Sequence, residues 1–246
     1  MQGILYVFHG SRIPEAIDAN VSFFQLVKEQ IEVPLQEMCF LELAEPDISQ
    51  GIERLVNQGG ANILIVPVLL LSAGHYYKDI PEKIIEVQEK YPEIVFRYGK
   101  PLGVQERILD VLIDRINESR VPVKEDTKLL LIGRGSKFEQ TKIDIETICE
   151  RLKGKTGLHH IQACFLAVTE PSFEQVLQQS LNEHHSQIFL VPYLWFTGFL
   201  MNFLQRKANE YSHCGKEIIL CRELGDHPHM IAALKDRVYE SLILNE

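Results

Sequence analysis

Three side chains of types that bind metals or move protons follow three successive β-like runs in the first half of this 246-residue chain. They are His9, Glu42 and His75. Because the carboxyl ends of parallel strands meet at one edge of a sheet, we expect these side chains to converge there. Two imidazoles and a carboxylate suit a borderline divalent metal such as iron(II), cobalt(II), nickel(II) or zinc. A lone histidine is more often an ordinary hydrogen-bonding residue, but this combination favours a metal site.

The chain repeats itself at a fixed offset of 125 residues without a gap. Gly10-Ser11 recurs as Gly135-Ser136, and Glu45-Pro46 recurs as Glu170-Pro171. The three metal-type side chains do not recur: their counterparts are Arg134, Ala167 and Leu200. A scaffold that keeps its turns but loses these side chains in one copy predicts two similar lobes, with the active constellation on the first.

Short β-branched runs alternate with longer helical patterns, which predicts an α/β fold of two lobes, each a parallel four-stranded sheet flanked by helices. We expect an N-terminal lobe at residues 1–120, a duplicated C-terminal lobe at 126–246, and a boundary at the polar stretch Ser119–Asp126. The expected strands are Gly3–Phe8, Gln36–Leu41, Ile63–Val68, Ile94–Tyr98, Lys128–Ile132, Ile161–Leu166, Ile188–Pro192 and Glu217–Cys221. The expected helices are Pro14–Glu32, Asp47–Gln58, Ile80–Lys90, Val104–Glu118, Lys137–Lys153, Ser172–Glu183, Phe199–Tyr211 and His229–Ile243.

The composition of the chain argues against several classes of protein. A formal net charge of −9 argues against a general nucleic-acid or membrane-surface binder. No signal peptide opens the chain, and the longest apolar runs, such as Ile63–Ser72, are too short to cross a bilayer. Five cysteines without a C-x-x-C pair fit a reduced, cytoplasmic setting and weaken an iron–sulfur interpretation.

Several residues near the trio have both a structural and a functional interpretation. Gly10 allows close backbone approach to a ligand, and Ser11 can cap a helix or donate to a carboxylate, so turn and binding roles stay equally open. Glu45 survives in both copies, which makes a turn or capping role at least as reasonable as chemistry. Glu42 does not survive, which favours a function specific to the first lobe.

The stretch Leu69–Tyr77 leaves its strand as an apolar run, passes small residues and ends with His75 and two tyrosines. It would suit a flat hydrophobic ligand beside a metal ligand, while a packed loop is the alternative. The matched segment Trp195–Met201 is also apolar and aromatic, and would suit an opposite wall. A second possible metal group matches no zinc spacing and is disfavoured: His213, Cys214, Cys221, His227 and His229.

Three segments, taken together and in this order, resemble the class II chelatases of the sirohydrochlorin cobaltochelatase and ferrochelatase family. They are His9-Gly10-Ser11-Arg12, the run from Phe40 to Pro46, and the run from Pro67 to His75. The resemblance covers the whole chain, including its duplicated length. It implies two similar α/β lobes with a flat tetrapyrrole, sirohydrochlorin, in a cleft between them. It also implies insertion of a divalent metal into that tetrapyrrole.

The resemblance assigns roles residue by residue. His9 would be metal ligand and proton acceptor, His75 the second imidazole, and Glu42 an aid to both tasks. The substrate would be lined by Ser11, Arg12, Glu45, Leu70, Leu71, Ser72, Ala73 and Gly74, with Arg134 and Ser136 from the second lobe. No catalytic role passes to the second lobe, because it lacks all three polar side chains.

The implied partners are sirohydrochlorin and a divalent metal, with Fe²⁺ or Co²⁺ as metal substrate and no tightly bound cofactor. Sirohydrochlorin carries eight carboxylates, so an acidic protein must supply local donors. Candidates are Arg12, Lys78, Arg134, Lys137, Arg206 and Lys207. Iron insertion to give sirohaem is favoured over cobalt insertion for cobalamin, because no histidine-rich tail is present. We expect a cytoplasmic monomer.

Two other classes compete with this interpretation. A metal-dependent hydrolase could use the same trio around an activated water, and would turn over small esters or phosphates. A tetrapyrrole or metal carrier would bind its ligand stoichiometrically and would not accelerate insertion.

Overall fold

The computed structural model describes residues 1–211 and 215–243 of the chain. The chain divides into two compact units, which are taken one at a time here. Unit 1 comprises Met1–Gly103 and the chain from Ile231 onward, and unit 2 comprises Val104–Met230.

Unit 1 holds a parallel sheet of four strands in the order β2-β1-β3-β4. The central strands are apolar on both faces, as expected for a parallel sheet covered by helices on each side. Its elements are β1 (Gln2–Phe8), α1 (Pro14–Lys28), β2 (Leu35–Phe40), α2 (Ile48–Asn57), β3 (Asn62–Pro67), the π-helical turn η1 (His75–Asp79), α3 (Ile80–Lys90), β4 (Val95–Tyr98) and α8 (Pro228–Ile243).

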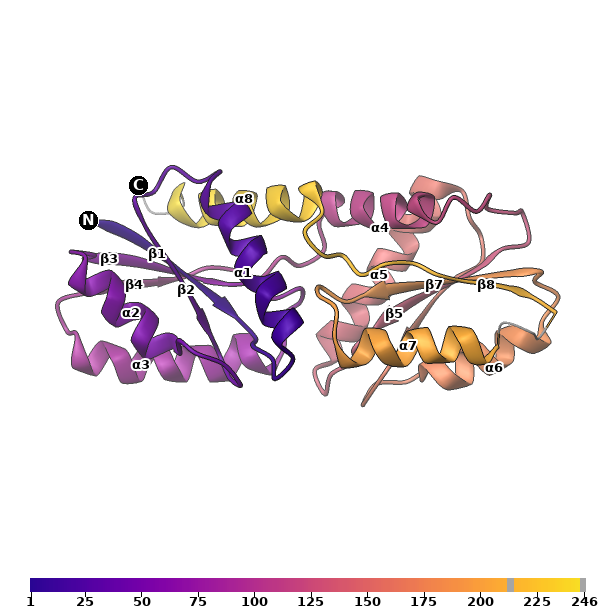
Figure 1. The fold of residues 1–246 in the computed structure, drawn as a ribbon, viewed down its shortest axis with the longest axis horizontal. Coiled ribbons are helices and arrows are strands. Elements are labelled where there is room, and N and C mark those ends of the chain that lie inside the picture. Colours follow the sequence, from indigo (N-terminus) through magenta and orange to yellow (C-terminus); the bar gives the residue numbers. More distant parts are fainter. Residues whose placement is uncertain (212–214, 244–246) are drawn as a thin grey trace. The chain divides into compact units, whose positions relative to one another are not determined.

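Alternate residues of the unit 1 strands pack against different helix layers. Leu5, Val7 and Ile65 belong to one core with buried residues of α2 and α3, whereas Tyr6 contacts Phe24 of α1 at 5.4 Å between ring centroids. Figure 1 shows α2 and α3 on one side of this sheet and α1 and α8 on the other. The sheet is therefore the middle of three layers, with its strand ends left open for loops.

Unit 2 repeats this architecture with the strand order β6-β5-β7-β8, again all parallel. Leu130, Ile132 and Leu190 form one core with residues of α6 and α7, while α4 packs against α5 and β7. The elements are α4 (Glu106–Glu118), β5 (Lys128–Gly133), α5 (Glu139–Thr156), β6 (Ile161–Phe165), α6 (Phe173–Asn182), β7 (Gln187–Tyr193), α7 (Phe199–Glu210) and β8 (Glu217–Leu220).

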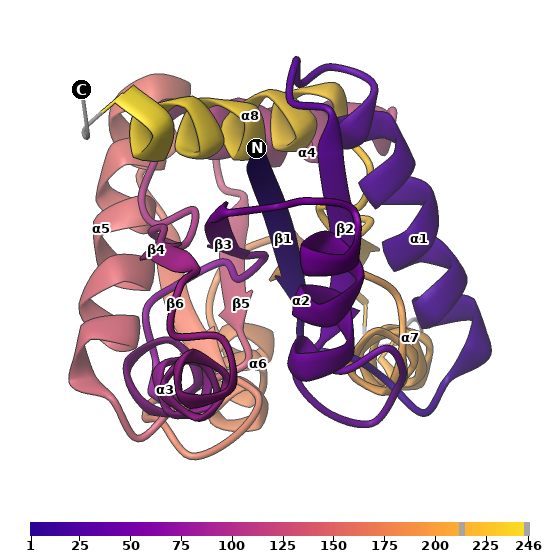
Figure 2. The same cartoon turned by 90° about the vertical axis from the view of Figure 1, so that its left-hand side faces the viewer.

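The last helix of each sequence repeat belongs to the unit built by the other repeat. Helix α4 lies in unit 2, where Lys155 of α5 pairs with its Asp110 at 2.6 Å. Helix α8 lies in unit 1, where Arg237 donates to the Leu102 carbonyl at 2.7 Å. Figure 2 shows the yellow α8 beside the indigo strands and helices of unit 1. The boundaries of the sequence repeats therefore differ from those of the compact units. The repeat shows that α4 and α8 are equivalent helices, but it does not show which of the two sheets each helix packs against.

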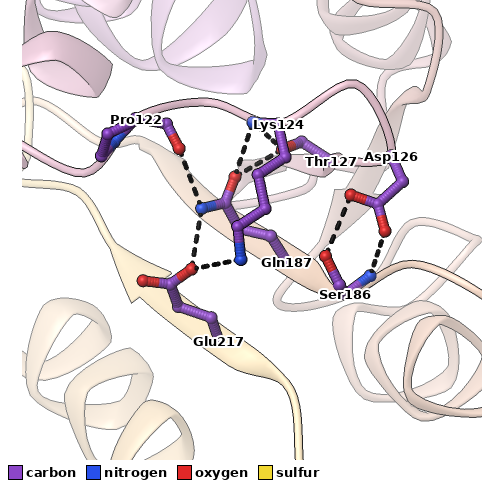
Figure 3. Close-up of polar contacts among 7 residues, drawn as sticks. All are labelled: Pro122, Lys124, Asp126, Thr127, Ser186, Gln187 and Glu217. Carbon is purple, nitrogen blue, oxygen red and sulfur yellow. Dashed lines mark hydrogen bonds and ion pairs between the residues drawn. The ribbon is translucent and has the colours of Figure 1, made fainter.

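The polar stretch expected as a boundary between lobes, Ser119–Asp126, is fastened to unit 2 (Figure 3). The fully buried Gln187 side chain accepts from the Lys124 N–H and donates to the Pro122 carbonyl, at 3.2 and 3.1 Å. Asp126 accepts from the N–H and hydroxyl of Ser186, at 2.8 and 3.0 Å. Since a buried amide without partners is costly, these bonds hold the stretch against β7.

The predicted strands and helices are present, with ends that differ by up to four residues; the largest difference is α1, which ends at Lys28 and not at Glu32. The stretch after β3 does not continue as a loop to Tyr77, because His75 opens η1. Glu42 follows the end of β2 by two residues. No helix among the described residues is long and apolar enough to span a bilayer.

The placement of α4 in unit 2 and of α8 in unit 1 can be tested with one pair of equivalent residues. The offset between the two halves is 125 residues at β3 and β7 but 122 residues at β4 and β8, so it is not fixed along the whole chain. Arg115 of α4 and Arg237 of α8 keep the offset of 122, which makes Leu112 and Leu234 equivalent, and both are buried. Replacing either with alanine should destabilise by about 2–5 kcal/mol, because a cavity is left. Native-state hydrogen exchange should show faster exchange in β5–β8 for Leu112→Ala and in β1–β4 for Leu234→Ala. The reverse assignment would contradict the exchange of helices.

Candidate metal and substrate site

The loops after β1 and β2 are joined by backbone hydrogen bonds that continue the strand ladder past its end. The Leu41 N–H donates to the Phe8 carbonyl at 2.8 Å, and the Glu42 N–H donates to the His9 carbonyl at 3.1 Å. Gly10 has a φ of 93°, and a Cβ there would lie 1.8 Å from the Glu42 carbonyl oxygen. Only glycine permits this approach, which brings His9 and Glu42 side by side.

His75 is positioned by the π-helical turn at the start of α3. The Tyr76 and Tyr77 N–H groups both donate to the Ala73 carbonyl, and Ile80 donates to the His75 carbonyl. Tyr98 of β4 also holds this turn. Its hydroxyl donates to the Tyr76 carbonyl at 3.0 Å, and the rings of Tyr98 and Tyr76 stack with centroids 5.0 Å apart. Single π turns within α-helices are rare and frequently occur at functional sites.

These elements bring the predicted trio together. One ligand atom from each of His9, Glu42 and His75 lies within 4.8 Å of the other two, and no other such group occurs among the described residues. His9 Nε2 lies 3.4 Å from Glu42 Oε1, and the two imidazole rings meet edge-on with centroids 4.8 Å apart. The side chains are only part-buried, with exposed fractions of 37% for His9 and 27% for His75, so an ion can reach them from solvent.

The hydrogen-bond partners define which nitrogens can bind a cation. His9 Nδ1 lies 3.1 Å from the Gly10 carbonyl oxygen, which can only accept, so Nδ1 carries the proton. In the neutral ring, Nε2 then presents a lone pair toward the Glu42 carboxylate. Two acceptors at this distance repel each other unless a proton or a metal ion lies between them. The geometry therefore favours a cation at this point.

His75 has a partner that the sequence analysis missed. Its Nδ1 lies 2.6 Å from Oδ2 of Asp79, four residues further along the π turn. The four-residue spacing between His75 and Asp79 does not by itself predict this hydrogen bond, because acidic residues are common in the first turn of helices.

Among the residues that the structure describes, no cysteine belongs to this site. The four described cysteines are all buried: Cys39, Cys149, Cys164 and Cys221. Burial raises the pKa of the Cys149 and Cys221 thiols to about 12, and raises that of Cys39 and Cys164 as well. Nitrogen and oxygen donors alone hold a borderline ion less firmly than thiolates do, which suits a site that must release its metal.

Ser11 lies near the trio but has a structural partner that recurs in unit 2. Ser11 Oγ accepts from the Ile13 N–H at 3.0 Å, as Ser136 Oγ does from Phe138 at 3.1 Å. Glu45 is exposed, and the peptide bond to Pro46 is cis, as its counterpart is in unit 2. Ser11 therefore has a turn role, and the contact of Ser11 and Glu45 with substrate stays a prediction.

The apolar run between β3 and η1 is part-buried, from Leu70 through Gly74. The Gly103 N–H donates to the Leu70 carbonyl at 2.8 Å, and the Leu102 N–H donates to the Leu69 carbonyl at 3.0 Å. These bonds fix the run beside the trio, and its half-exposed side chains leave apolar surface there. The predicted substrate-lining residues of this run are Leu70, Leu71, Ser72, Ala73 and Gly74.

Two of the side chains predicted to bind the substrate carboxylates are exposed: Arg12 in unit 1 and Arg134 in unit 2. Lys207 already pairs with Glu174 and Glu210, at 3.3 and 3.1 Å. Of the disfavoured second metal group, His213 and Cys214 lie outside the described residues. Within the described residues, Cys221 is buried and His227 pairs with Asp114 at 3.3 Å.

Fold and site together define a class: duplicated α/β proteins of parallel four-stranded sheets, with one histidine–carboxylate metal site at the strand ends of a single unit. The chain belongs to the CbiX family, which it matches over residues 3–119 and 128–241.

The chain is similar to proteins of this family along its whole length. It is 43% identical to a sirohydrochlorin ferrochelatase of Priestia megaterium, over 97% of this chain and 90% of that protein. It is 35% identical to a sirohydrochlorin cobaltochelatase of the same organism, over 98% of this chain and 80% of that protein. Among solved structures, SirB from Bacillus subtilis with Fe³⁺ has a TM-score of 0.92 and 37% identity, covering 98% of this chain and 96% of that one.

Alanine substitutions at the equivalent glycines Gly10 and Gly135 should have different effects on metal binding. Gly10 and Gly135 have φ values of 93° and 90°, and a Cβ at either would meet a carbonyl oxygen at 1.8 Å. Alanine at either position should destabilise by at least about 1–2 kcal/mol, because L-residues are strained there. Only Gly10→Ala should also weaken Co²⁺ binding, measured by titration, since Gly10 packs against the backbone of Glu42 whereas Gly135 packs against that of Ala167. Equal loss of affinity in both variants would contradict this assignment.

Proposed function

We propose that this protein is a sirohydrochlorin ferrochelatase, a lyase of tetrapyrrole biosynthesis. It inserts Fe²⁺ into sirohydrochlorin to give sirohaem, with release of two pyrrole protons. The observation that carries the proposal is the His9, Glu42 and His75 cluster, in a chain similar along its whole length to a ferrochelatase. Anaerobic absorbance of the protein with sirohydrochlorin and Fe²⁺ tests it: the tetrapyrrole spectrum should change with turnover, and unchanged rates over the protein-free reaction would refute it.

Iron is the proposed metal substrate, and no resident cofactor is needed. The identity to the ferrochelatase exceeds that to the cobaltochelatase of the same organism, which supports iron. Imidazole and carboxylate donors also accept Co²⁺, so cobalt insertion at a lower rate is expected in the same assay.

The trio holds the incoming ion before transfer. His9 and His75 supply imidazole nitrogens, and Glu42 supplies a negative charge 3.4 Å from His9 Nε2. Three part-exposed donors leave other positions on the ion open for the pyrrole nitrogens. The ion can therefore exchange protein ligands for tetrapyrrole ligands one at a time.

The same side chains take up the protons that the ion displaces. A neutral imidazole accepts a proton near pH 7, and the Glu42 carboxylate stabilises the imidazolium that forms. A nitrogen that is coordinated cannot accept a proton. His9 or His75 therefore becomes a proton acceptor only when its nitrogen is not bound to the metal.

The tetrapyrrole is proposed to lie on the apolar run Leu70–Gly74, with its carboxylates bound by polar side chains. Arg12 and Ser11 are the proposed donors in unit 1, and Arg134 and Ser136 are the proposed donors in unit 2. Glu45 is proposed to contact the substrate edge. Because the chain carries a net charge of −9, these local donors are needed for an octacarboxylate to bind. A monomeric, cytoplasmic enzyme stays the expectation from sequence.

His9→Ala and His75→Ala should each abolish most activity without unfolding the protein. Each removes a metal ligand and proton acceptor, and general acid–base groups alone contribute about 10²–10⁴-fold to rates. The free energy of unfolding should change by no more than about 1 kcal/mol, since unit 2 keeps the same fold with Arg134 and Leu200 at these positions. Insertion rates and thermal unfolding check both parts. Wild-type turnover in either variant would remove that histidine from the site.

Glu42→Gln should weaken Co²⁺ or Fe²⁺ binding in the absence of tetrapyrrole, because it keeps the shape of the side chain and removes the charge beside His9. Glu45→Gln is the matched control: it removes the same charge from the same loop, and it should leave metal affinity close to wild type. Titration of each variant with Co²⁺ measures this. If Glu45→Gln weakens binding and Glu42→Gln does not, the wrong glutamate has been assigned to the metal.

A further inference from the structure

The carboxylate of Asp79 contacts His75 from outside the predicted trio. Its Oδ2 lies 2.6 Å from His75 Nδ1, a short distance for a nitrogen–oxygen hydrogen bond. Both residues lie on η1, where the π turn places positions 75 and 79 on the same side. The Asp79 side chain is 44% exposed and that of His75 is 27% exposed, so the bond forms at the rim of the site.

The bond decides which nitrogen of His75 can bind a metal. An ionised carboxylate only accepts hydrogen bonds, so Nδ1 must carry the proton. In the neutral ring, the lone pair then resides on Nε2. The opposite tautomer would have a proton on Nε2, which could then neither bind an ion nor accept a proton. His9 reaches the same tautomer through the Gly10 carbonyl, so both rings have Nδ1 as donor.

The duplicated half of the chain supplies an independent observation. In unit 2, helix α7 follows β7 as η1 and α3 follow β3, and its first six residues, Phe199–Leu204, include neither a histidine nor an acidic residue. The same half has Leu200 in place of His75, and there the helix α7 is α-helical from Phe199 without a π turn. Asp79 is therefore lost together with His75, and the backbone form that joins them is lost as well. A merely structural carboxylate would not be expected to follow the histidine in this way.

We propose that Asp79 is a positioning residue of the metal site, which holds the His75 ring in the Nδ1–H tautomer and orients Nε2 for the ion. The proposal rests on the proposed role of His75 as a metal ligand. Carboxylate partners of ligating histidines fix the tautomer and ring orientation and make the ring a better donor, and their loss costs about 10–100-fold in metal affinity or activity. Asp79 itself touches neither the metal nor the tetrapyrrole in this role.

The first test needs no substitution. Nitrogen-15 NMR of histidine-labelled wild-type protein reports the tautomer of each ring, with the His75 signal assigned by its loss in His75→Ala. At a pH where the ring is neutral, His75 should be protonated on Nδ1. A neutral His75 protonated on Nε2 would overturn the proposal, whatever the variants do.

The second test compares two substitutions at position 79 by Co²⁺ titration without tetrapyrrole and by Fe²⁺ insertion rate. Asp79→Leu removes the hydrogen-bond acceptor of His75 Nδ1, and should lower metal affinity about 10–100-fold. Asp79→Asn retains an oxygen that can accept from Nδ1, so it should keep the tautomer and recover part of the affinity. Glu82→Ala removes an exposed negative charge from the first turn of the following helix, and should leave both quantities unchanged.

The outcomes separate this proposal from the assignment of the site. If His75→Ala binds Co²⁺ as tightly as wild type, the metal role of His75 fails, and the role of Asp79 fails with it. If His75→Ala loses affinity while Asp79→Leu keeps wild-type affinity and tautomer, only the positioning role fails. Thermal unfolding of each variant identifies any loss that comes from misfolding, and the wild-type spectrum decides the question if Asp79→Leu does not fold.

Discussion

The close approach of the Glu42 carbonyl to Gly10 is the constraint on which the site depends. It leaves no space for a side chain at position 10, and it aligns the loops after β1 and β2 so that their side chains emerge together. The same approach joins Gly135 and Ala167 in unit 2, where no metal-type side chain follows. The backbone arrangement is thus a property of the fold, and the chemistry is added by three residues and the turn that holds His75.

The site is built from acceptors that face one another. His9 Nε2 and the Glu42 carboxylate lie 3.4 Å apart, and their mutual repulsion is relieved when a cation or a proton arrives. Because both side chains are part-exposed, water screens much of this interaction, and the stabilisation of a bound ion stays modest. A moderate affinity suits a protein whose metal is a substrate, since an ion held by buried thiolates would be slow to leave.

The sequence predicts the sheet, the helices and the trio, because each depends on local patterning and on parallel strands that end at one edge. It does not predict η1, since one extra residue in a helical turn leaves the periodicity of the flanking residues almost unchanged. Asp79 is missed for the same reason, because its contact with His75 depends on the π turn that brings the two side chains together. The assignment of α4 and α8 is missed because equivalent helices have equivalent apolar faces, and either sheet could accept either helix.

The exchange of α4 and α8 has a consequence for biogenesis. Unit 2 is one continuous segment of chain, whereas unit 1 needs both Met1–Gly103 and helix α8, which is made after unit 2. During synthesis from the N-terminus, the strands that carry His9 and His75 emerge first but must wait for α8 before their sheet is covered on both faces. The unit that carries the proposed metal site is therefore completed only after unit 2 has been synthesised.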